Sequence, residues 1–460
     1  MRIERAAVIG LALAGIVGAA GAEPLTADRA VQIALQKSTE IVNARASVYD
    51  ARSTLYGAYS GIMPSVQGAW SRSVSRIDDV SGTVSFGASS FPSTLHEQER
   101  YSTTPALTGT WPILDLSAIA GARSARFGMK ASQLSLQAAR NDVALETRRR
   151  FYTAVTGYHL ARVATQSLKL ARDDERRVRA LFEVGSVSRS DLLKAQVSTA
   201  NSQLDSLTAR QNLVNQRIAL AQILAMREDQ LGDVDTVLTA EPHDYDEATL
   251  LSEAEKGRPD LLSAEAELRA ARQGVAAARF AWLPYLSLSG SMDLRSNSRT
   301  KSSQPYVRPL NGGSATFVAV DTTFTSGATT DRQYQGTVAL NWDILNGLQT
   351  SSRNAQAKAR LLRAQESRDA LARNLEADVH QALNTYRLAI ERQAVAQSSL
   401  ESATENLKLT QQKYNVGSTT ILDLIDAQVS LARVDADRVS ALAAMRIAEA
   451  QLNRVRGKNE

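Results

Sequence analysis

The sequence has no cysteine among its 460 residues, and aromatic side chains make up only 5% of it. The absence of thiols excludes disulfides, zinc sites with thiolate ligands and cysteine nucleophiles. The net charge of +5 is small for this length, and no basic cluster is interleaved with aromatic residues. Nucleic acid is therefore not an expected partner.

Motifs that would indicate catalysis are also missing. The four histidines are scattered along the chain without the spacing of metal ligands. No phosphate-binding loop, nucleophile elbow or zinc-protease motif occurs. The sequence therefore predicts that the protein is not an enzyme and that it holds neither a metal nor a cofactor.

Long apolar runs are absent after the first residues. Residues 1–22 have a basic start, a short alanine-rich apolar stretch and an A-x-A site at 20–22. This pattern predicts a secretory signal peptide over 1–22, with the mature protein beginning at Glu23. Because no later segment resembles an apolar helix, a chain that crosses a membrane would have to use β-strands.

Proline and glycine are nearly absent from two long regions. No proline falls in 113–241 or after 309, and only Gly157 and Gly185 occur between 129 and 231. Both residue types interrupt helices. The segment from Gly121 to Val184, roughly 64 residues, therefore predicts a helix about 95 Å long. After it, apolar residues from Leu193 to Ile218 alternate steps of four and three, which predicts a coiled-coil seam.

An internal repeat organises the chain. "VGSVSRSDLLKAQ" at 184–196 returns as "VGSTTILDLIDAQ" at 416–428, and "TWPILD" at 110–115 returns as "NWDILN" at 341–346. The order in each half is helix, strand, strand, long helix, turn and long helix. We expect one repeat over 23–240 and a second over 241–460.

The segments between the helices have the pattern of strands. From Leu286 to Arg295, apolar residues alternate with serine and charged residues. Segments of about ten such residues are typical of transmembrane β-strands, although a half-buried soluble sheet shows the same alternation. Residues 76–100 and 297–331, rich in Ser, Thr and Gly, are expected to form exposed loops. Four strands cannot close a barrel, so a membrane protein of this plan would have to oligomerise.

Carboxylates follow both VGS turns. Ser188 with Asp191, and Thr420 with Asp423, fit the capping box that begins a helix. Asp426 lies a turn beyond the second cap, on the same helix face as Asp423. Capping explains Asp191 well and Asp426 poorly, whereas Asp423 fits either a cap or an acidic pore ring. The first repeat has Lys194 at the position of Asp426, so only the second repeat would supply two acidic rings.

Taken in order and twice over, these motifs resemble the TolC-like outer-membrane efflux protein family. The resemblance covers essentially the whole mature chain. It implies a mostly helical α+β fold in which coiled-coil hairpins form a periplasmic α-barrel tunnel. Four strands per protomer would contribute to a 12-stranded transmembrane β-barrel that a homotrimer shares.

The family resemblance also implies partners and a location. The protein would lie in the outer-membrane lipid, with its tunnel in the periplasm. It would dock on a periplasmic adaptor protein and on an inner-membrane pump of the RND or ABC type. It would then export drugs or, in type I secretion, proteins. A pore-free secreted coiled-coil scaffold or adhesin is the alternative from another class.

Sites are implied by the same resemblance. The tip turns would dock the adaptor, and they comprise Val184, Gly185, Ser186, Val187, Ser188, Val416, Gly417, Ser418, Thr419 and Thr420. The periplasmic gate would involve Asp423, Asp426, Asp191, Tyr414 and Thr419. Relatives carry a gate-closing arginine at the position of Thr419, and Arg189 on the other tip is one candidate to replace it. The exported substrate, the identity of the adaptor and pump, the gate's latch and the extent of an equatorial domain stay open.

Overall fold

The computed structural model describes residues 24–86, 89–309, 317–326 and 329–458. The expected signal peptide lies outside these residues. The described chain falls into two units. One unit lies within Met1–Val48, Ser132–Ala264 and Arg368–Glu460, and the other within Tyr49–Ala131 and Glu265–Ser367.

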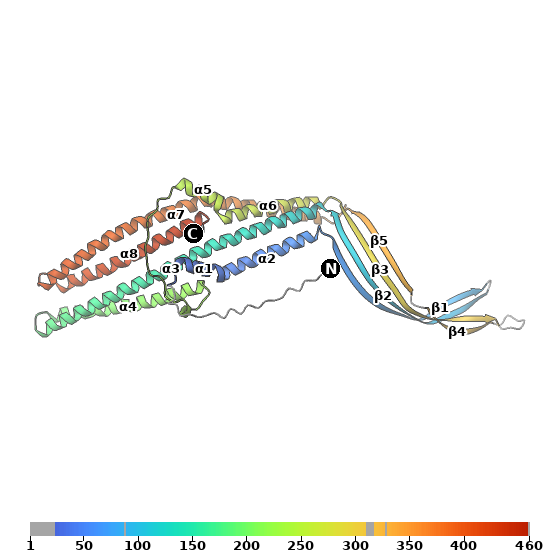
Figure 1. The fold of residues 1–460 in the computed structure, drawn as a ribbon, viewed down its shortest axis with the longest axis horizontal. Helices are drawn as coiled ribbons and strands as arrows, with labels where there is room; N and C mark the ends of the chain where they lie inside the picture. Colours follow the sequence, from blue (N-terminus) through green and yellow to red (C-terminus); the bar gives the residue numbers. More distant parts are fainter. Residues whose placement is uncertain (1–23, 87–88, 310–316, 327–328, 459–460) are drawn as a thin grey trace, which may run out of the picture. The chain divides into compact units, whose positions relative to one another are not determined.

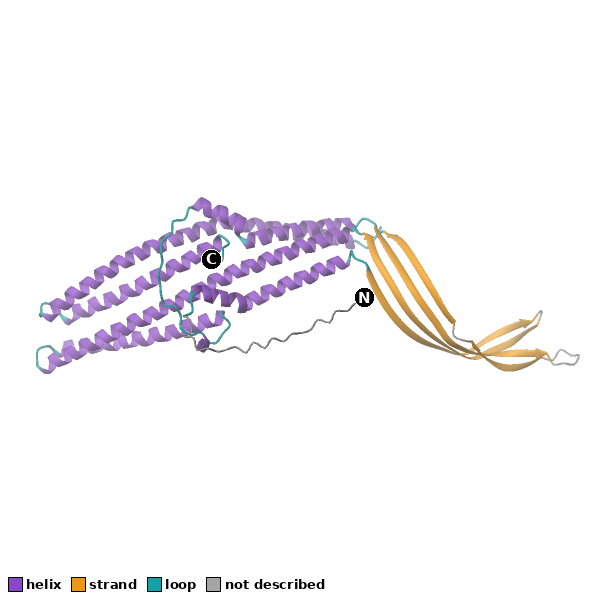
Figure 2. Ribbon diagram, viewed as in Figure 1, coloured by secondary structure: helices purple, strands orange, loops and turns teal. Residues whose placement is uncertain are grey.

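Helices form the larger share of the chain (Figure 2). Their order is the same in both halves. The first half contains α1 (Ala27–Lys37), α2 (Thr39–Ser60), α3 (Leu116–Glu183) and α4 (Arg189–Ile223), followed by the 3-10 turn η1 (Glu228–Gln230). The second contains α5 (Glu247–Gly257), α6 (Pro259–Phe280), α7 (Gln349–Asn415) and α8 (Ile421–Val455). The uninterrupted helix expected from the missing prolines is confirmed by the 68 residues of α3. Within the described helices, no segment is both long and apolar enough to span a bilayer.

Two apolar clusters hold the helical unit together. In the first, Ala34 of α1, Val155 of α3 and Leu220 of α4 are buried together. In the second, Leu250 of α5 packs with Tyr386 of α7 and Leu452 of α8. Each cluster joins a short helix to a long hairpin, so the burial of apolar surface fixes the hairpins where the short helices cross them.

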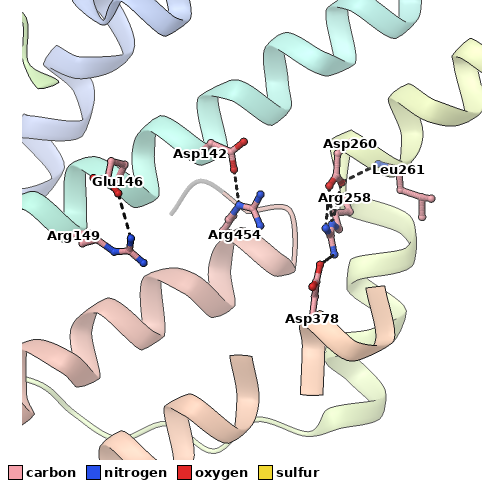
Figure 3. A network of polar contacts seen from close by, with 8 residues as sticks. All are labelled: Asp142, Glu146, Arg149, Arg258, Asp260, Leu261, Asp378 and Arg454. Atoms are coloured by element: carbon pink, nitrogen blue, oxygen red, sulfur yellow. Dashed lines mark hydrogen bonds and ion pairs between the residues drawn. The ribbon is translucent and has the colours of Figure 1, made fainter. Parts of the chain in front are cut away.

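Ion pairs supplement these clusters (Figure 3). The side chain of Arg258 is only 8% exposed and lies between two carboxylates, at 3.0 Å from Asp260 and 2.7 Å from Asp378. Nearby, Arg454 Nε donates a hydrogen bond of 2.5 Å to Asp142, which joins α8 to α3. The buried guanidinium is therefore compensated on both sides, as a buried charge requires.

The second unit is dominated by an antiparallel sheet (Figure 1). It contains β1 (Ser65–Phe86), β2 (Ser89–Leu114), β3 (Tyr285–Pro309), β4 (Phe317–Ser326) and β5 (Thr329–Asn341). β1 pairs with β2 and β2 with β3. Both β4 and β5 pair with β3, so the expected fourth strand is present but divided in two.

The expectation of exposed loops at 76–100 and 297–331 is wrong for most of their length. The ladder between β1 and β2 continues to the pair Phe86 and Ser89, and β3 continues to Pro309 against β4. The apolar alternation that marks a strand in sequence ends earlier than the backbone pairing does. Backbone pairing needs no apolar face, and the Thr and Val residues of these segments favour extended structure. Residues 87–88, 310–316 and 327–328 lie outside the described parts.

The register of the strands gives the sheet one apolar face and one polar face. Gly68 pairs with Leu107, Leu107 with Met292 and Met292 with Tyr334, so the side chains of Leu107, Met292 and Tyr334 share a face. Other members of this apolar face are Val66, Trp70, Trp111, Leu288, Val338 and Leu340. The intervening residues, largely Ser, Thr and Gln, form the polar face.

No described element covers this apolar face. Trp70, Tyr334 and Val338 are 66–69% exposed within the chain. A half-buried soluble sheet, the other reading of the alternation, would pack these side chains against a core. A contiguous exposed apolar surface of this kind marks an interaction with lipid or another chain.

Candidate functional site

The two long hairpins end in turns of the same construction. Gly185 and Gly417 have φ values of +78° and +76°, in the left-handed region that glycine adopts without penalty. Ser186 N donates to Leu181 O at 2.8 Å, and Ser418 N donates to Lys413 O at 2.9 Å. With the bonds from the two glycine N–H groups, these contacts make a Schellman motif in each turn.

The first turn is followed by a complete capping box. Asp191 N donates to Ser188 Oγ at 3.1 Å, and the Ser188 hydroxyl and backbone N donate to the Asp191 carboxylate at 2.7 and 3.4 Å. The two bonds to the carboxylate stabilise its ionised form, so the hydrogen bonds from Ser188, above all that from its hydroxyl, lower the pKa of Asp191. Asp191 also lies 3.6 Å from Lys194. The predicted capping role of Asp191 is confirmed.

The second turn places more donors around its acid. Asp423 Oδ2 accepts hydrogen bonds from Thr419 Oγ1 at 2.6 Å, Thr420 Oγ1 at 2.7 Å and Thr420 N at 2.9 Å. The bond from Thr419, followed by those from Thr420, lowers the pKa of Asp423 to about 2. Asp423 is thus both a helix cap and a carboxylate that stays ionised far below neutral pH. The hydroxyl of Thr419 therefore forms its hydrogen bond locally, with Asp423 four residues further along the same chain.

Asp426 is arranged differently from Asp423. It is exposed on α8, one turn beyond the cap, and makes no hydrogen bond or ion pair with any described residue. Arg189 likewise has no ion-pair partner in the described part of the chain. The second repeat therefore presents one anchored carboxylate and one free carboxylate on the same face of α8, whereas Lys194 occupies the matching position of α4.

An apolar cluster joins the tips of the two hairpins. Val178 of α3 and Ala195 of α4 are buried together with Ile421 and Leu424 of α8. The ring of Tyr414 packs against this cluster, and its burial raises the pKa of the phenol. Among the described residues Tyr414 has no hydrogen-bond partner, so it contributes packing to the tip.

Two polar contacts cross between the hairpins, and sequence reasoning did not find them. Gln428 Nε2 donates to Asp174 Oδ2 at 2.5 Å, and Arg177 donates to Asn415 at 3.4 Å. Asp174 is buried, and this burial raises its pKa despite the bond from Gln428. A signal was present for Gln428, because both repeats carry an Ala-Gln pair after the turn. No such signal marked Asp174, because it belongs to a charged run, "RDDERR", which is typical of a solvent-exposed helix face.

A groove runs between α4 and α8 behind the tips. Its volume is about 670 Å³, and its apolar lining includes Leu193 and Val197 of α4 with Ile425 and Val429 of α8. The seam expected from Leu193 to Ile218 is largely exposed within the chain. Smaller residues of α4 are buried instead, namely Ala195, Thr199 and Ser206. The seam is therefore a surface that no described helix covers.

Comparison with known proteins assigns the family. The profile described as "Outer membrane efflux protein" matches residues 30–226 and again residues 250–458. The chain belongs to the outer membrane efflux protein family. This family consists of channel proteins rather than enzymes. Both hairpin turns and all the tip residues named above fall inside the two matched segments.

Similar members of the outer membrane efflux protein family include two TolC proteins. The outer membrane protein TolC of Escherichia coli (strain K12) is 27% identical over 254 residues, which cover 54% of this chain and 48% of TolC. TolC of Vibrio cholerae is 24% identical over 247 residues, which cover 54% of this chain and 52% of TolC. The matched segment thus spans about half the length of these curated relatives.

Solved structures extend the similarity to nearly the whole fold. The outer membrane channel CmeC of Campylobacter jejuni superposes with a TM-score of 0.73 at 18% identity, covering 94% of this chain and 85% of CmeC. A membrane protein of Pseudomonas aeruginosa superposes with a TM-score of 0.74 at 19% identity, covering 94% of this chain and 90% of that protein. The open state of the MtrE outer membrane channel of Neisseria gonorrhoeae superposes with a TM-score of 0.68 at 17% identity, covering 94% of this chain and 89% of MtrE.

Proposed function

We propose that the protein is an outer-membrane exit channel that passes substrates out of the periplasm. The observation that carries this proposal is the uncovered apolar face of the sheet, which includes Trp70, Tyr334 and Val338. An apolar face on one side and Ser, Thr and Gln on the other is the pattern of a strand between lipid and a polar lumen. A pore-free scaffold would have no use for such a sheet.

The proposed channel is a homotrimer. Within the described chain the sheet is open, because β1 pairs only with β2 on one edge and β4 and β5 pair only with β3 on the other. An open edge in a bilayer leaves backbone groups unpaired, each at a cost of several kcal/mol. Three chains with four strand positions each would close a 12-stranded barrel and remove every edge. The exposed seam of α4 would similarly find its partner in a neighbouring chain.

The helical hairpins would line a periplasmic tunnel whose entrance lies at their tips. The turns at 184–188 and 416–420 are exposed or half-buried and anchored by Schellman motifs and capping boxes. They suit the docking of a periplasmic adaptor that links the channel to an inner-membrane pump. The two halves, 23–240 and 241–460, would act as repeats of one unit, in line with the two matches of the family profile.

The entrance would carry the acids of the second repeat. Repeated by threefold symmetry, Asp423 and Asp426 would form two acidic rings about one helical turn apart. Such rings repel anions and attract cations. Asp423 keeps its charge because Thr419 and Thr420 hydrogen-bond to its carboxylate.

Neighbouring residues on β5 supply a matched test. Val338 lies on the apolar face and Thr337 on the polar face of the same strand. We expect Val338→Asp to abolish heat-modifiable trimers in outer-membrane fractions, because it places a charge against lipid. Thr337→Asp should leave them intact. Purified wild-type trimers should also give ion conductance in planar bilayers. A monomeric, non-conducting protein that tolerates both substitutions equally would favour the scaffold.

A further inference from the structure

The segment between β5 and α7 exposes more apolar surface than a loop in water normally does. It reads "WDILNGL" over residues 342–348. Leu345 is 90% exposed, and Trp342, Ile344 and Leu348 are also exposed. Between Arg332 and Arg353 the only charged residue is Asp343. Clustered exposed apolar side chains with so little charge mark a contact surface.

The structure holds this segment in a defined conformation. At its start, Trp342 Nε1 donates a hydrogen bond of 3.1 Å to Trp282 O. At its end, Asn346 Nδ2 donates at 2.5 Å to Oγ1 of Thr350, which is buried. Gly347 and Leu348 follow with φ values of +61° and +68°. Leucine rarely adopts this left-handed conformation, and such outliers cluster at functional sites.

The segment also continues the apolar face of the sheet. In β5 the apolar face holds Tyr334, Val338 and Leu340, all at even positions. Trp342 and Ile344 extend the same alternation past the last strand residue, Asn341. The apolar residues of the sheet face and those of the segment therefore follow one another directly in the sequence.

The other half of the chain carries a related stretch with a different fold, "WPILDL" at 111–116, in which Trp111, Ile113, Leu114 and Leu116 are 39–50% exposed. There β2 runs to Leu114, Asp115 Oδ1 accepts a hydrogen bond from Ala118 N at 2.9 Å, and α3 begins at Leu116. The corresponding turn in the second half is longer and carries its apolar side chains outside any strand or helix, where Ile344, Leu345 and Leu348 are 72–90% exposed. What the repeat does not account for is this greater exposure.

We infer that residues 342–348 form a lipid anchor that lies in the headgroup and upper acyl zone of the inner leaflet of the outer membrane. This inference rests on the proposed function, because it takes the sheet to be embedded in lipid. The interfacial zone suits the segment better than the hydrocarbon interior. Its irregular backbone needs hydrogen-bond partners that the interior lacks, Asp343 needs water, and tryptophan concentrates at membrane interfaces.

The cysteine-free chain allows the inference to be tested at single positions. Three full-length variants would each carry one cysteine labelled with a nitroxide: Leu345→Cys in the segment, Val338→Cys on the apolar sheet face, and Val184→Cys in a hairpin turn. Val184 is a matched control, because it is an apolar residue with 74% of its surface exposed. Each variant would be reconstituted in vesicles of phosphatidylethanolamine and phosphatidylglycerol.

The measurement compares the accessibility of each label to oxygen, which concentrates in lipid, and to a water-soluble nickel chelate. We expect the ratio of oxygen to nickel accessibility to be several-fold higher at 345 than at 184, and highest at 338. A label at 345 that behaves like the one at 184, while 338 reports lipid, overturns the anchor and leaves the channel standing.

Two other results are equally decisive. A label at 345 that is shielded from both reagents, while 338 reports lipid, means that a second copy of the chain covers the segment, and it overturns the lipid anchor. A label at 338 that is accessible chiefly to nickel overturns the proposed function itself, and the anchor with it.

Discussion

Gln428 donates a hydrogen bond of 2.5 Å to Asp174 although the two residues are 254 positions apart in the chain. The bond joins α8 of one hairpin to α3 of the other, next to the apolar cluster at their tips. Asp174 is buried, and burial raises its pKa because desolvation disfavours the charged carboxylate. The guanidinium of Arg177 lies 3.9 Å from the same carboxylate. The contact therefore ties the two hairpins together at the expected tunnel entrance.

Removal of the amide should loosen the tips. Gln428→Ala would leave the buried Asp174 carboxylate with one hydrogen bond fewer, at a cost of about 1–3 kcal/mol. We expect faster amide hydrogen exchange in the parts of α3 and α8 that flank this contact. Gln196 occupies the same place in the first repeat and has no hydrogen-bond partner among the described residues, so Gln196→Ala is the control. Equal exchange in the two variants would show that the contact contributes nothing.

A fall in pH should change the contributions of Asp174 and Asp423 to stability in opposite directions. Because the pKa of Asp174 is raised in the folded chain, its contribution to stability is present below its ordinary pKa of 3.8 and is lost as the pH rises through the folded value. The pKa of Asp423 is lowered to about 2, so its contribution is present above 3.8 and is lost as the pH falls towards 2.

Each contribution can be isolated with an asparagine variant. As the pH falls from neutral to 3.8, we expect the local stability of wild type relative to Asp174→Asn to increase. Below 3.8 the advantage of wild type over Asp423→Asn should decline. Hydrogen exchange at the start of α8 and around residue 174, measured over a pH series, reports both. Differences that do not change with pH would refute the assignments.

Much of the helical architecture follows from the sequence. The scarcity of proline and glycine predicted α3, and the paired motifs predicted both turns and the capping role of Asp191. The lengths of the strands could not be predicted, because hydrogen-bonded pairing continues beyond the point where apolar alternation stops. The contact between Asp174 and Gln428 could not be predicted from the sequence either. It depends on how the two hairpins pack, and no local sequence pattern encodes that packing. The exposure of Leu345 could not be predicted either, because it depends on which segments of the fold pack against this residue.

The acidic rings proposed at the entrance make a prediction about ion selectivity. Asp426→Asn removes one free carboxylate per chain, or three per trimer, and should reduce cation selectivity and block by multivalent cations several-fold in single-channel recordings. Asp423→Asn should add to this effect. Asp191→Asn is the control, because that residue caps α4 and is paired with Lys194. Selectivity and block that stay unchanged in the double variant of 423 and 426 would exclude the rings.

Two glycines with the same backbone conformation should differ in their tolerance of a side chain. Gly417 and Gly457 have φ values of +76° and +78°, so alanine costs about 1–2 kcal/mol at either position. A Cβ at Gly417 meets no atom within 4 Å, whereas at Gly457 it would lie 2.3 Å from Gly257 O. We expect Gly457→Ala to lower the Tm clearly more than Gly417→Ala. Equal shifts in thermal unfolding would contradict the close approach of the chain end to α5.

Tryptophans at matching positions of the two halves each donate a hydrogen bond to the turn that precedes the first strand of their strand pair. Trp111 Nε1 donates to Ile62 O at 3.3 Å, and Trp342 Nε1 donates to Trp282 O at 3.1 Å. Phenylalanine at 111 or 342 keeps an apolar ring but removes an exposed hydrogen bond, at a cost of about 0.5–1.5 kcal/mol.

We therefore expect Trp111→Phe and Trp342→Phe each to lower the temperature at which the detergent-solubilised protein unfolds. Trp70→Phe is the matched control, because the Trp70 indole lies on the apolar sheet face and has no hydrogen-bond partner among the described residues. Since the two indole bonds lie in separate strand pairs, their effects should add in the double variant. A control that unfolds at as low a temperature as the other two would mean that loss of ring size, rather than loss of the donor, destabilises the protein.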